Sequence, residues 1–287
     1  MKKPLIGFVG QGYVGKHYGD DFEKRGYKII RYSLEPQFVQ NKDKIRDCDV
    51  VFIAVPTPST PKGFDASIVE SALKLVGVGK IAVIKSTILP GTTKRLQKKY
   101  KNITLLFSPE FLSVTTAAHD ASHPSENIIG LPVEDKKHMA AAKLVHSILP
   151  KAPFVLTSSS DEAEVFKYTH NLSGYAQIIM FNILYDLASK LGCSWEPIQK
   201  MAEADPLISN RYARPFHKSG RGAGGGCFIK DMAAARSLYE KLLSKDTEGL
   251  AVLRALEKKN IKLLRSTKKD LDLLAGVYGT KVASQKK

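Results

Sequence analysis

The sequence has few cysteines and no long apolar run, and both absences narrow the class of protein. Cys48, Cys193 and Cys227 are the three cysteines among 287 residues, and no two of them have C-x-x-C spacing. An odd count without paired spacing disfavours a disulfide framework or a zinc site, so we expect a reducing cytoplasm and no metal centre. No run reaches the roughly 18 apolar residues of a membrane span. The first residues also lack the cleavage site of a secretory leader.

Acidic residues are also scarce relative to basic ones. The chain has 28 Asp and Glu against 44 Lys and Arg, a formal net charge of +16. Such a charge suits anionic partners, either phosphorylated metabolites or nucleic acid. Because no helix-turn-helix, zinc-finger or RNA-recognition pattern accompanies it, we interpret most of the charge as a solvated lysine-rich surface and expect no nucleic-acid or membrane partner.

Continuous apolar runs alternate with amphipathic stretches through the first half of the chain. The apolar runs predict strands at Leu5–Val9, Lys28–Arg31, Val50–Val55, Ile81–Lys85, Ile103–Phe107, Asn127–Gly130 and Pro153–Leu156. The amphipathic stretches predict helices at Tyr13–Arg25, Ser67–Leu75, Thr92–Lys99 and Glu134–Leu149. This alternation is typical of a parallel sheet covered on both faces, so we predict a Rossmann-like, doubly wound α/β domain over residues 1–157.

The pattern becomes helical after about residue 158. Asp161–Leu191 has no proline, one glycine and apolar residues at helical spacing, which predicts one helix of roughly 45 Å. A glycine-rich loop at Gly220–Gly226 precedes further helices at Lys230–Leu243 and Gly249–Leu264. We predict an all-α central domain over residues 158–275, with the long helix as a dimerisation element, and a disordered tail over residues 276–287.

A glycine-rich turn follows the first predicted strand. Residues 10–15 read GQGYVG, which fits G-x-G-x-x-G, and the next predicted helix begins within this motif. These glycines permit a tight turn and the close approach of a pyrophosphate, whose charge is stabilised at a helix N-terminus. Between a strand and a helix the motif predicts a dinucleotide site.

The end of the second predicted strand lacks the expected acidic residue. That residue usually binds the adenosine ribose, and by spacing Ser33 takes its position. Glu35 is a second candidate for the ribose, whereas Ser33 with Arg31 is equally compatible with a 2′-phosphate. The cofactor is therefore expected to be NAD, with NADP not excluded.

Cys227 lies in the most informative segment, GGGCFIKD at residues 224–231. The three glycines allow a ligand to approach the backbone, and the start of a helix stabilises a thiolate. Lys230 adds positive charge, and Asp231 lies one helical turn from the cysteine. A nucleophilic thiolate beside an acid or base is what thioester chemistry requires. The alternative is a buried structural cysteine, which is how we interpret Cys48 and Cys193.

Lys167 and Asn171 are four residues apart on the predicted long helix and share one face. An ammonium and an amide there would stabilise a developing oxyanion. An exposed polar stripe is the alternative that spacing alone favours.

The ordered motifs of this chain resemble those of the UDP-glucose/GDP-mannose dehydrogenase family. They are GQGYVG at residues 10–15, VPTP at 55–58, KST at 85–87, SPEFL at 108–112, ExxKxxxN at 164–171 and GGGCxxKD at 224–231. The resemblance implies a Rossmann domain, a helical central domain, and two oxidations of a nucleotide-sugar alcohol to a carboxylate with two NAD⁺.

The resemblance also implies roles for individual residues. Cys227 corresponds to the nucleophile, Glu110 to the group assisting thioester hydrolysis, Lys167 to the oxyanion stabiliser, and Asn171, Asp231 and Thr87 to groups that position the alcohol or a water. The expected cofactor contacts are Gly10, Gly12, Tyr13, Val14, Gly15, Ser33, Thr57, Ser86, Thr87 and Lys230. The expected substrate contacts are Glu110, Phe111, Leu112, Lys167, Asn171, Arg211, Phe216, Lys218 and Gly224.

Three positions or regions depart from the family pattern. Val114 stands where a second glutamate is usual, and Ser33 replaces the ribose-binding aspartate. The C-terminal domain that holds much of the substrate nucleotide is not apparent after residue 249, where no alternating strands and helices follow. The resemblance therefore bears on the chemistry more than on the substrate.

Two other functions remain open from the sequence. A two-domain β-hydroxyacid dehydrogenase has a similar size and a Lys-xxx-Asn pair, but it needs no cysteine. The second alternative is a non-catalytic dinucleotide-binding protein that has lost its substrate domain.

A homodimer is expected, because the long helix offers more apolar surface than one small chain would bury. The family resemblance adds that Arg211, sixteen residues before the cysteine, acts across subunits. The lysines near the C-terminus predict a solvated helix face rather than substitute phosphate contacts; they are Lys258, Lys259, Lys262, Lys268 and Lys269.

Overall fold

The structure, a computed structural model, describes residues 3–284 and divides them into two compact units. The first unit extends to Thr57 and resumes at Asp65–Lys167, and the second comprises Pro58–Phe64 and the chain from Tyr168 onward. The sequence placed the boundary at residue 158, whereas the structure assigns the beginning of the long helix to the first unit.

A seven-stranded sheet forms the centre of the first unit, in the order β2-β1-β3-β6-β7-β8-β9. The strands are β1 (Ile6–Val9), β2 (Ile29–Tyr32), β3 (Val50–Ile53), β6 (Ile81–Ile84), β7 (Thr104–Phe107), β8 (Glu126–Leu131) and β9 (Phe154–Ser159). All seven correspond to strands predicted from apolar runs. The predicted parallel sheet differs at one place, because β8 runs antiparallel to β7 and only then pairs in parallel with β9.

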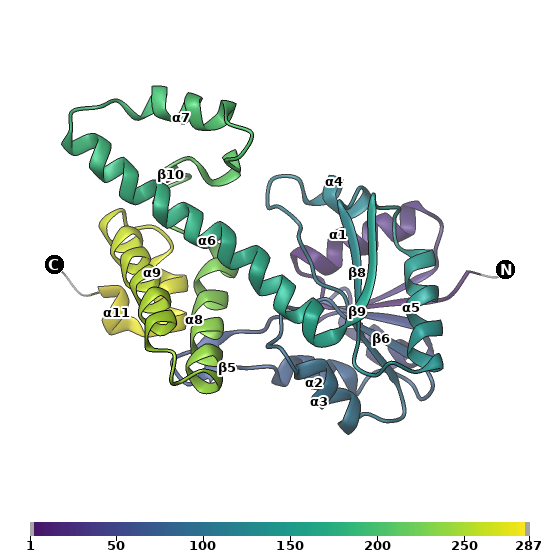
Figure 1. The fold of residues 1–287 in the computed structure, drawn as a ribbon. Coiled ribbons are helices and arrows are strands. Elements are labelled where there is room, and N and C mark those ends of the chain that lie inside the picture. Colours follow the sequence, from purple (N-terminus) through teal and green to yellow (C-terminus); the bar gives the residue numbers. More distant parts are fainter. Residues whose placement is uncertain (1–2, 285–287) are drawn as a thin grey trace. The chain divides into compact units, whose positions relative to one another are not determined.

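Helices cover both faces of this sheet (Figure 1). They are α1 (Tyr13–Lys24), η1 (Val39–Asp47), α2 (Ser67–Leu73), α3 (Thr92–Lys99), α4 (Ala117–Ser122) and α5 (Lys136–Ile148). Alternate strand residues such as Phe8 and Phe52 pack with Phe22 of α1 and Val145 of α5 to form one buried face. In Figure 1, α2 and α3 lie on the other face, which places the sheet in the middle of three layers.

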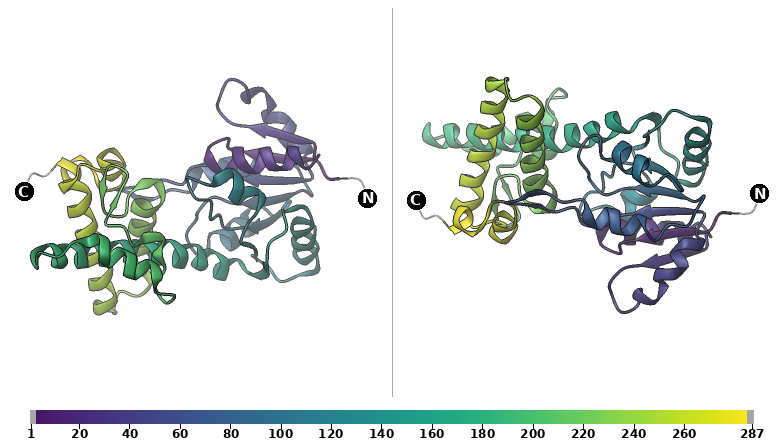
Figure 2. Two further views of the ribbon diagram at one scale, coloured as in Figure 1. Left: turned by 90° about the horizontal axis from the view of Figure 1, so that it is seen from above. Right: turned by 90° about the horizontal axis from the view of Figure 1, so that it is seen from below.

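The second unit is built mainly from helices. They are α6 (Ser160–Lys190), which begins in the first unit, α7 (Trp195–Ala204), η2 (Asn210–Tyr212), α8 (Gly225–Leu242), α9 (Thr247–Ser266), α10 (Leu271–Tyr278) and α11 (Thr280–Ser284). The views in Figure 2 show α6 as one unbroken helix, as its apolar spacing predicted. Tyr175, Ile179, Met232 and Leu263 form the buried core that joins α6, α8 and α9.

Two expectations for the second unit need correction. The unit is not all-α, because it contains the hairpins β4 (Ser59–Thr60) with β5 (Gly63–Phe64), and β10 (Phe216–His217) with β11 (Gly220–Arg221). The tail expected to be disordered from residue 276 is helical in its described part, because Leu274 and Val277 pack into a cluster with Leu264. Residues 285–287 of that expected tail lie outside the described residues.

Candidate active site

The carboxyl ends of five parallel strands bring most of the predicted cofactor residues to one edge of the sheet. β1, β2, β3, β6 and β7 are neighbours and run in one direction. The segments after them carry the GxGxxG turn, Ser33, Thr57, the KST motif and the SPEFL motif. A ligand site at this edge is the general rule for open α/β sheets.

The GxGxxG turn has the backbone shape that a bound pyrophosphate needs. Gly10 has φ 93°, and a Cβ on Gly15 would lie 1.9 Å from the Gly10 carbonyl oxygen, so both positions require glycine. A Cβ on Gly12 would meet open space. Gly12 is the N-cap of α1 and makes no side-chain capping bond. The turn therefore fits a dinucleotide phosphate, with Tyr13, Val14 and Gly15 in the first helical turn.

The end of β2 favours an unphosphorylated ribose. Arg31 forms ion pairs of 2.8 Å with Asp20 and Glu23 of α1, where the absence of a side chain on Gly19 makes room for the guanidinium. This engagement removes the cation that the sequence offered for a 2′-phosphate. Ser33 Oγ accepts the Glu35 N–H at 3.2 Å, so the pair forms a local turn beside the expected ribose position.

The segments after β3 and β6 are tied to each other. Thr57 Oγ1 donates to the Thr87 carbonyl at 2.7 Å. Ser86 Oγ accepts the Val55 N–H at 2.9 Å and donates to the Val55 carbonyl at 2.7 Å. Both polar atoms of Val55 are therefore held by Ser86, which shows a structural role for this predicted cofactor contact.

A buried acid and a buried base face each other after β6 and β7. Lys85 Nζ lies 3.7 Å from Glu110 Oε2, and their side chains are 2% and 9% exposed. Glu110 Oε1 accepts the Leu112 N–H at 2.6 Å. Burial lowers the pKa of Lys85, and the Glu110 carboxylate opposes that shift. Lys85 was not among the predicted site residues, although its place directly after a buried strand, within the KST motif, was an available signal.

Lys167 joins the Glu110 segment from the beginning of α6. Its ammonium donates to the Glu110 carbonyl oxygen and lies 5.0 Å from the centre of the Phe111 ring. Lys167 is buried at 6% exposure. The exposed polar stripe that spacing alone favoured is therefore wrong for this residue. Lys167, Glu110 and Phe111 form one cluster within the first unit.

Cys227 lies in the first turn of α8 and is exposed. The helix begins at Gly225, five residues before the predicted start, with Gly224 as an N-cap that makes no side-chain capping bond. The amides of this turn and the helix dipole favour an anion at this end of the helix. The structure thus excludes the reading of Cys227 as a buried structural cysteine. Cys48, by contrast, is fully buried, and Cys193 is exposed.

Asp231 follows Cys227 by one helical turn and is fixed from two sides. Asn171 Nδ2 donates to Asp231 Oδ2 at 2.6 Å, and Lys230 Nζ contacts Oδ1 at 2.5 Å. Asp231 and Asn171 are buried at 1% and 6% exposure. Lys230, expected at the cofactor, thus pairs with Asp231 here, and the Lys230 carbonyl accepts the Ser59 hydroxyl.

The other predicted substrate residues lie on the segment between α7 and α8. Arg211, Phe216 and Lys218 are exposed, and Lys218 has φ 54°. The Phe216 ring packs edge-on against Tyr185 with centroids 5.4 Å apart. Gly224 is half-buried at the N-cap of α8. All four residues belong to the second unit together with Cys227.

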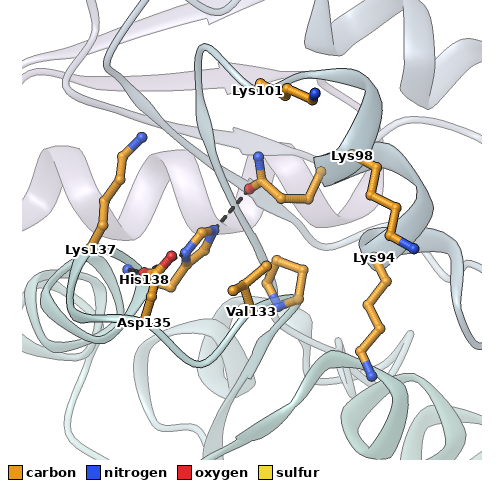
Figure 3. Close-up of a pocket in the computed structure, with 9 residues that line it drawn as sticks. Lys94, Lys98, Lys101, Val133, Asp135, Lys137 and His138 are labelled. Carbon is orange, nitrogen blue, oxygen red and sulfur yellow. Dashed lines mark hydrogen bonds and ion pairs between the residues drawn. The ribbon is translucent and has the colours of Figure 1, made fainter.

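A separate hollow of about 320 Å³ lies away from these residues, between the second half of α3 and the segment from Pro132 to His138. Four lysines line it: Lys94, Lys98, Lys101 and Lys137 (Figure 3). Its buried His138 is paired on both ring nitrogens, since Nδ1 lies 2.8 Å from Oδ1 of the exposed Asp135 and Nε2 lies 2.9 Å from Oε1 of the buried Gln97. The predicted site residues do not line this hollow.

Two features of other classes of protein are absent from residues 3–284. In this part of the chain, His, Cys, Asp and Glu form no group of three that would hold a metal ion. Over the same range, none of the helices combines the length and the apolar character that crossing a membrane requires.

Comparison with family models matches two segments of the chain. Residues 36–149 match the NAD binding domain of the UDP-glucose/GDP-mannose dehydrogenase family, and residues 161–261 match its central domain. The curated UDP-glucose 6-dehydrogenase TuaD of Bacillus subtilis is 29% identical over 278 residues, covering 82% of this chain and 58% of that protein. The chain thus spans little more than half the length of this relative.

Comparison with solved structures gives the same fold. A UDP-glucose dehydrogenase from Pyrobaculum islandicum aligns with a TM-score of 0.78 and 24% identity over 96% of this chain and 71% of that chain. A 3-hydroxyisobutyrate dehydrogenase from Mycobacterium tuberculosis aligns with a TM-score of 0.72 and 16% identity over 96% and 99% of the two chains. At these identities both alignments bear on the fold alone.

Proposed function

Because the chain belongs to the UDP-glucose/GDP-mannose dehydrogenase family, we propose that it oxidises the primary alcohol of a nucleotide sugar to a carboxylate through Cys227. The observation that carries this proposal is the exposed thiol in the first turn of α8. One turn later in the same helix lies the buried Asp231, which accepts hydrogen bonds from Asn171 and Lys230. A simple alcohol dehydrogenase has no need of such a cysteine, whereas oxidation to an acid can proceed through a covalent thioester on it.

The dinucleotide would bind at the carboxyl edge of the sheet. Gly10, Gly12 and Gly15 shape the pyrophosphate turn, and Ser33 with Glu35 lies at the ribose position. When bound, NAD⁺ accepts the two electrons and one hydrogen that the substrate carbon loses in each oxidation. Thr57 and Thr87, joined by a hydrogen bond, would hold the neighbouring loops in place for this step.

The cysteine would keep the aldehyde from leaving between the two oxidations. The Cys227 sulfur forms a bond to the aldehyde carbon, giving a thiohemiacetal. The second oxidation converts this adduct to a thioester. Water then adds to the thioester carbonyl and the carbon–sulfur bond breaks, which releases a carboxylate and regenerates the thiol. In total, one alcohol, one water and two NAD⁺ give one carboxylate, two NADH and three protons.

The polar residues around these steps have separate roles in the proposal. Lys167 and Asn171 stabilise the oxyanions, with one turn of α6 between them. Asp231, oriented by Asn171, accepts a proton from the alcohol or a water. Glu110, beside the buried Lys85, assists the attack of water on the thioester. Thr87 helps to position that water.

The sugar nucleotide would be held by residues from both parts of the sequence. From the first unit we propose Phe111 and Leu112, together with Glu110 and Lys167. From the second unit we propose Arg211, Phe216, Lys218 and Gly224. Arg211 is exposed on η2, which is compatible with action on a neighbouring subunit's substrate in a homodimer.

The proposal is tested by measuring NADH formation and acid product with UDP-glucose, UDP-N-acetylmannosamine and GDP-mannose. We expect one of these substrates to give two NADH per acid formed. Cys227→Ser should abolish acid formation, and Cys193→Ser, the matched exposed cysteine, should leave it unchanged. If no nucleotide sugar supports Cys227-dependent NADH formation, the proposal is wrong.

Two alternatives give different results in the same assays. A β-hydroxyacid dehydrogenase, whose fold the Mycobacterium tuberculosis structure exemplifies, would reduce NAD⁺ equally well with Cys227→Ser. A non-catalytic dinucleotide-binding protein would bind NAD⁺ in calorimetry and turn over none of the substrates.

A further inference from the structure

The loop that leads into the Cys227 helix is held by one later segment of the chain. Residues Arg221 to Gly225 bond through their main-chain atoms to side chains between Asn260 and Asp270. This holding segment is the end of α9 and the turn into α10. Because the loop has three glycines, its own sequence restrains it weakly.

Asn260 makes the most specific of these contacts. Its Oδ1 accepts the Ala223 N–H at 2.7 Å, and its Nδ2 donates to the Ala223 carbonyl at 2.9 Å. The side chain is buried at 2% exposure. An amide is the side chain that offers one acceptor and one donor in this arrangement, and an aspartate in its place would face the Ala223 carbonyl with a second oxygen.

Lys269 and Asp270 continue the contact towards the cysteine. Lys269 Nζ donates to the Gly222 carbonyl at 2.9 Å, and burial lowers the pKa of this lysine. Asp270 Oδ2 accepts the Gly225 N–H at 2.8 Å, and Gly225 is the first residue of α8. The Asp270 carboxylate therefore binds the main chain two residues before Cys227.

Steric fit supports the same contact. A Cβ on Gly224 would lie 2.0 Å from Asp270 Oδ2, and one on Gly222 would lie 2.8 Å from Asn260 Oδ1. Gly222 also has φ 93°, a conformation that suits glycine. The glycines thus let the loop approach the holding segment closely, which gives them a role besides the approach of a ligand.

We propose that Asn260 and Asp270 are positioning residues for Cys227, which fix the loop before α8 and thereby the place of the thiol in its first turn. This inference rests on the proposed role of Cys227 as the nucleophile. The physical reason is that the helix N-terminus stabilises a first-turn thiolate only while the helix begins at Gly225. Without the two side chains, the glycine loop gains conformations in which the first turn is unwound.

The test measures the alkylation rate of Cys227 by iodoacetamide, which needs no substrate. A Cys193→Ser background leaves Cys227 as the exposed cysteine, since Cys48 is buried. We expect the ratio of the alkylation rate at about pH 7 to that at about pH 9 to be about fivefold lower in Asp270→Ala than in Asp270→Asn, because both variants lack the carboxylate charge and only the alanine loses the bond to the loop. Asp270→Asn keeps an oxygen acceptor for the Gly225 N–H.

Asp246→Ala is the matched control. Asp246 caps α9 by accepting the Gly249 N–H at 2.9 Å, so its loss destabilises the same unit without touching the glycine loop. Both alanine variants should lower the melting temperature, but Asp270→Ala alone should change thiol reactivity. An equal ratio in folded Asp270→Ala and Asp270→Asn would overturn the proposal, even if Asn260→Ala fails to fold.

A double-mutant cycle tests the steric part. Gly224→Ala should reduce the alkylation ratio in the parent protein and have less effect when Asp270 is already alanine. Strictly additive effects would contradict the contact.

In turnover assays, positioning predicts a fall in kcat with little change in KM. A lowered alkylation ratio in Asp270→Ala with unchanged turnover would instead count against the proposed function of Cys227 and leave the positioning intact.

Discussion

At the residue scale, the buried pair of Lys85 and Glu110 is the feature that sequence reasoning did not anticipate as a unit. The two residues come from neighbouring strand ends, 25 positions apart in sequence. A carboxylate buried without a counter-charge is costly, and Lys85 places a cation beside Glu110. Tyr18 lies in the same buried environment. Its burial is the larger cause that raises the pKa of its phenol, and the Glu110 carboxylate is the next.

Lys85→Met is expected to slow the release of acid product by more than tenfold, because removal of one partner leaves the other charge buried. If Glu110 assists hydrolysis, both NADH of the first turnover should still form, and the thioester should accumulate on Cys227. Rapid-quench mass spectrometry of the protein would detect this adduct. Lys85→Arg, which retains the charge, should recover part of the rate.

The matched control is Lys80→Met, which removes an exposed ion pair with Asp49 in the same unit. Exposed pairs contribute little stability, so turnover should be nearly normal. Equal slowing of both NADH steps in Lys85→Met, without an accumulated adduct, would contradict the role assigned to the pair.

At the element scale, Glu164 attaches the beginning of α6 to the N-terminal end of α3. Glu164 accepts the N–H of Gly91 at 2.6 Å, the N–H of Thr93 at 2.9 Å, and the Thr93 hydroxyl at 2.5 Å. Glu164 is fully buried, and burial raises its pKa to about 7 although these three donors lower it. This contact gives a reason why the first unit includes the start of α6.

The stability of the chain is expected to fall as pH rises from about 4.5 to about 7, to the extent that Glu164 contributes. In that range the folded state binds a proton that the unfolded state has released, so a rising pH favours unfolding. Glu164→Gln cannot ionise and removes this dependence. Melting temperatures across the range should therefore show wild type losing stability relative to Glu164→Gln. A difference that does not vary with pH would rule out ionisation of Glu164 as the cause.

At the scale of the whole molecule, α6 has an exposed apolar stripe. Met180, Leu184, Leu187 and Leu191 are 53%, 44%, 55% and 70% exposed and follow one another at four, three and four residues. This spacing places them on one helix face. A long unpartnered apolar face on a protein with a net charge of +16 supports the homodimer proposed above.

Leu184→Glu with Leu187→Glu is expected to shift the protein from dimer to monomer in sedimentation equilibrium, because the stripe would bury two charges. Leu242→Glu, at the end of α8 and 68% exposed, is a control outside α6 and should leave the mass unchanged. A parent chain that sediments as a monomer at micromolar concentration would exclude this interface.

The sequence by itself determined the parallel core of the sheet, the long helix, and the chemistry available at each strand end. Its apolar runs and helical spacings locate the strands and helices within a few residues. A strand buried on both faces is a continuous apolar run, and a helix buried on one face has apolar residues at helical spacing. It also indicated Cys227 as a candidate nucleophile, since three glycines before a cysteine are recognisable without a fold. The reversal of β8 had no such signal, because a buried apolar run is the same in either direction.

Only the tertiary structure decided which polar groups act together. Three of these groupings are ion pairs: Lys85 with Glu110, Arg31 with Asp20 and Glu23, and Lys230 with Asp231. In a fourth, the side chains of Asn260 and Asp270 bond to the main chain of the glycine loop. Most of them join positions far apart in the sequence. Polar contacts depend on distance and direction after packing, whereas hydrophobic burial depends mainly on pattern. For this reason the sequence indicated what Cys227 could do, and the structure indicated what holds it in place.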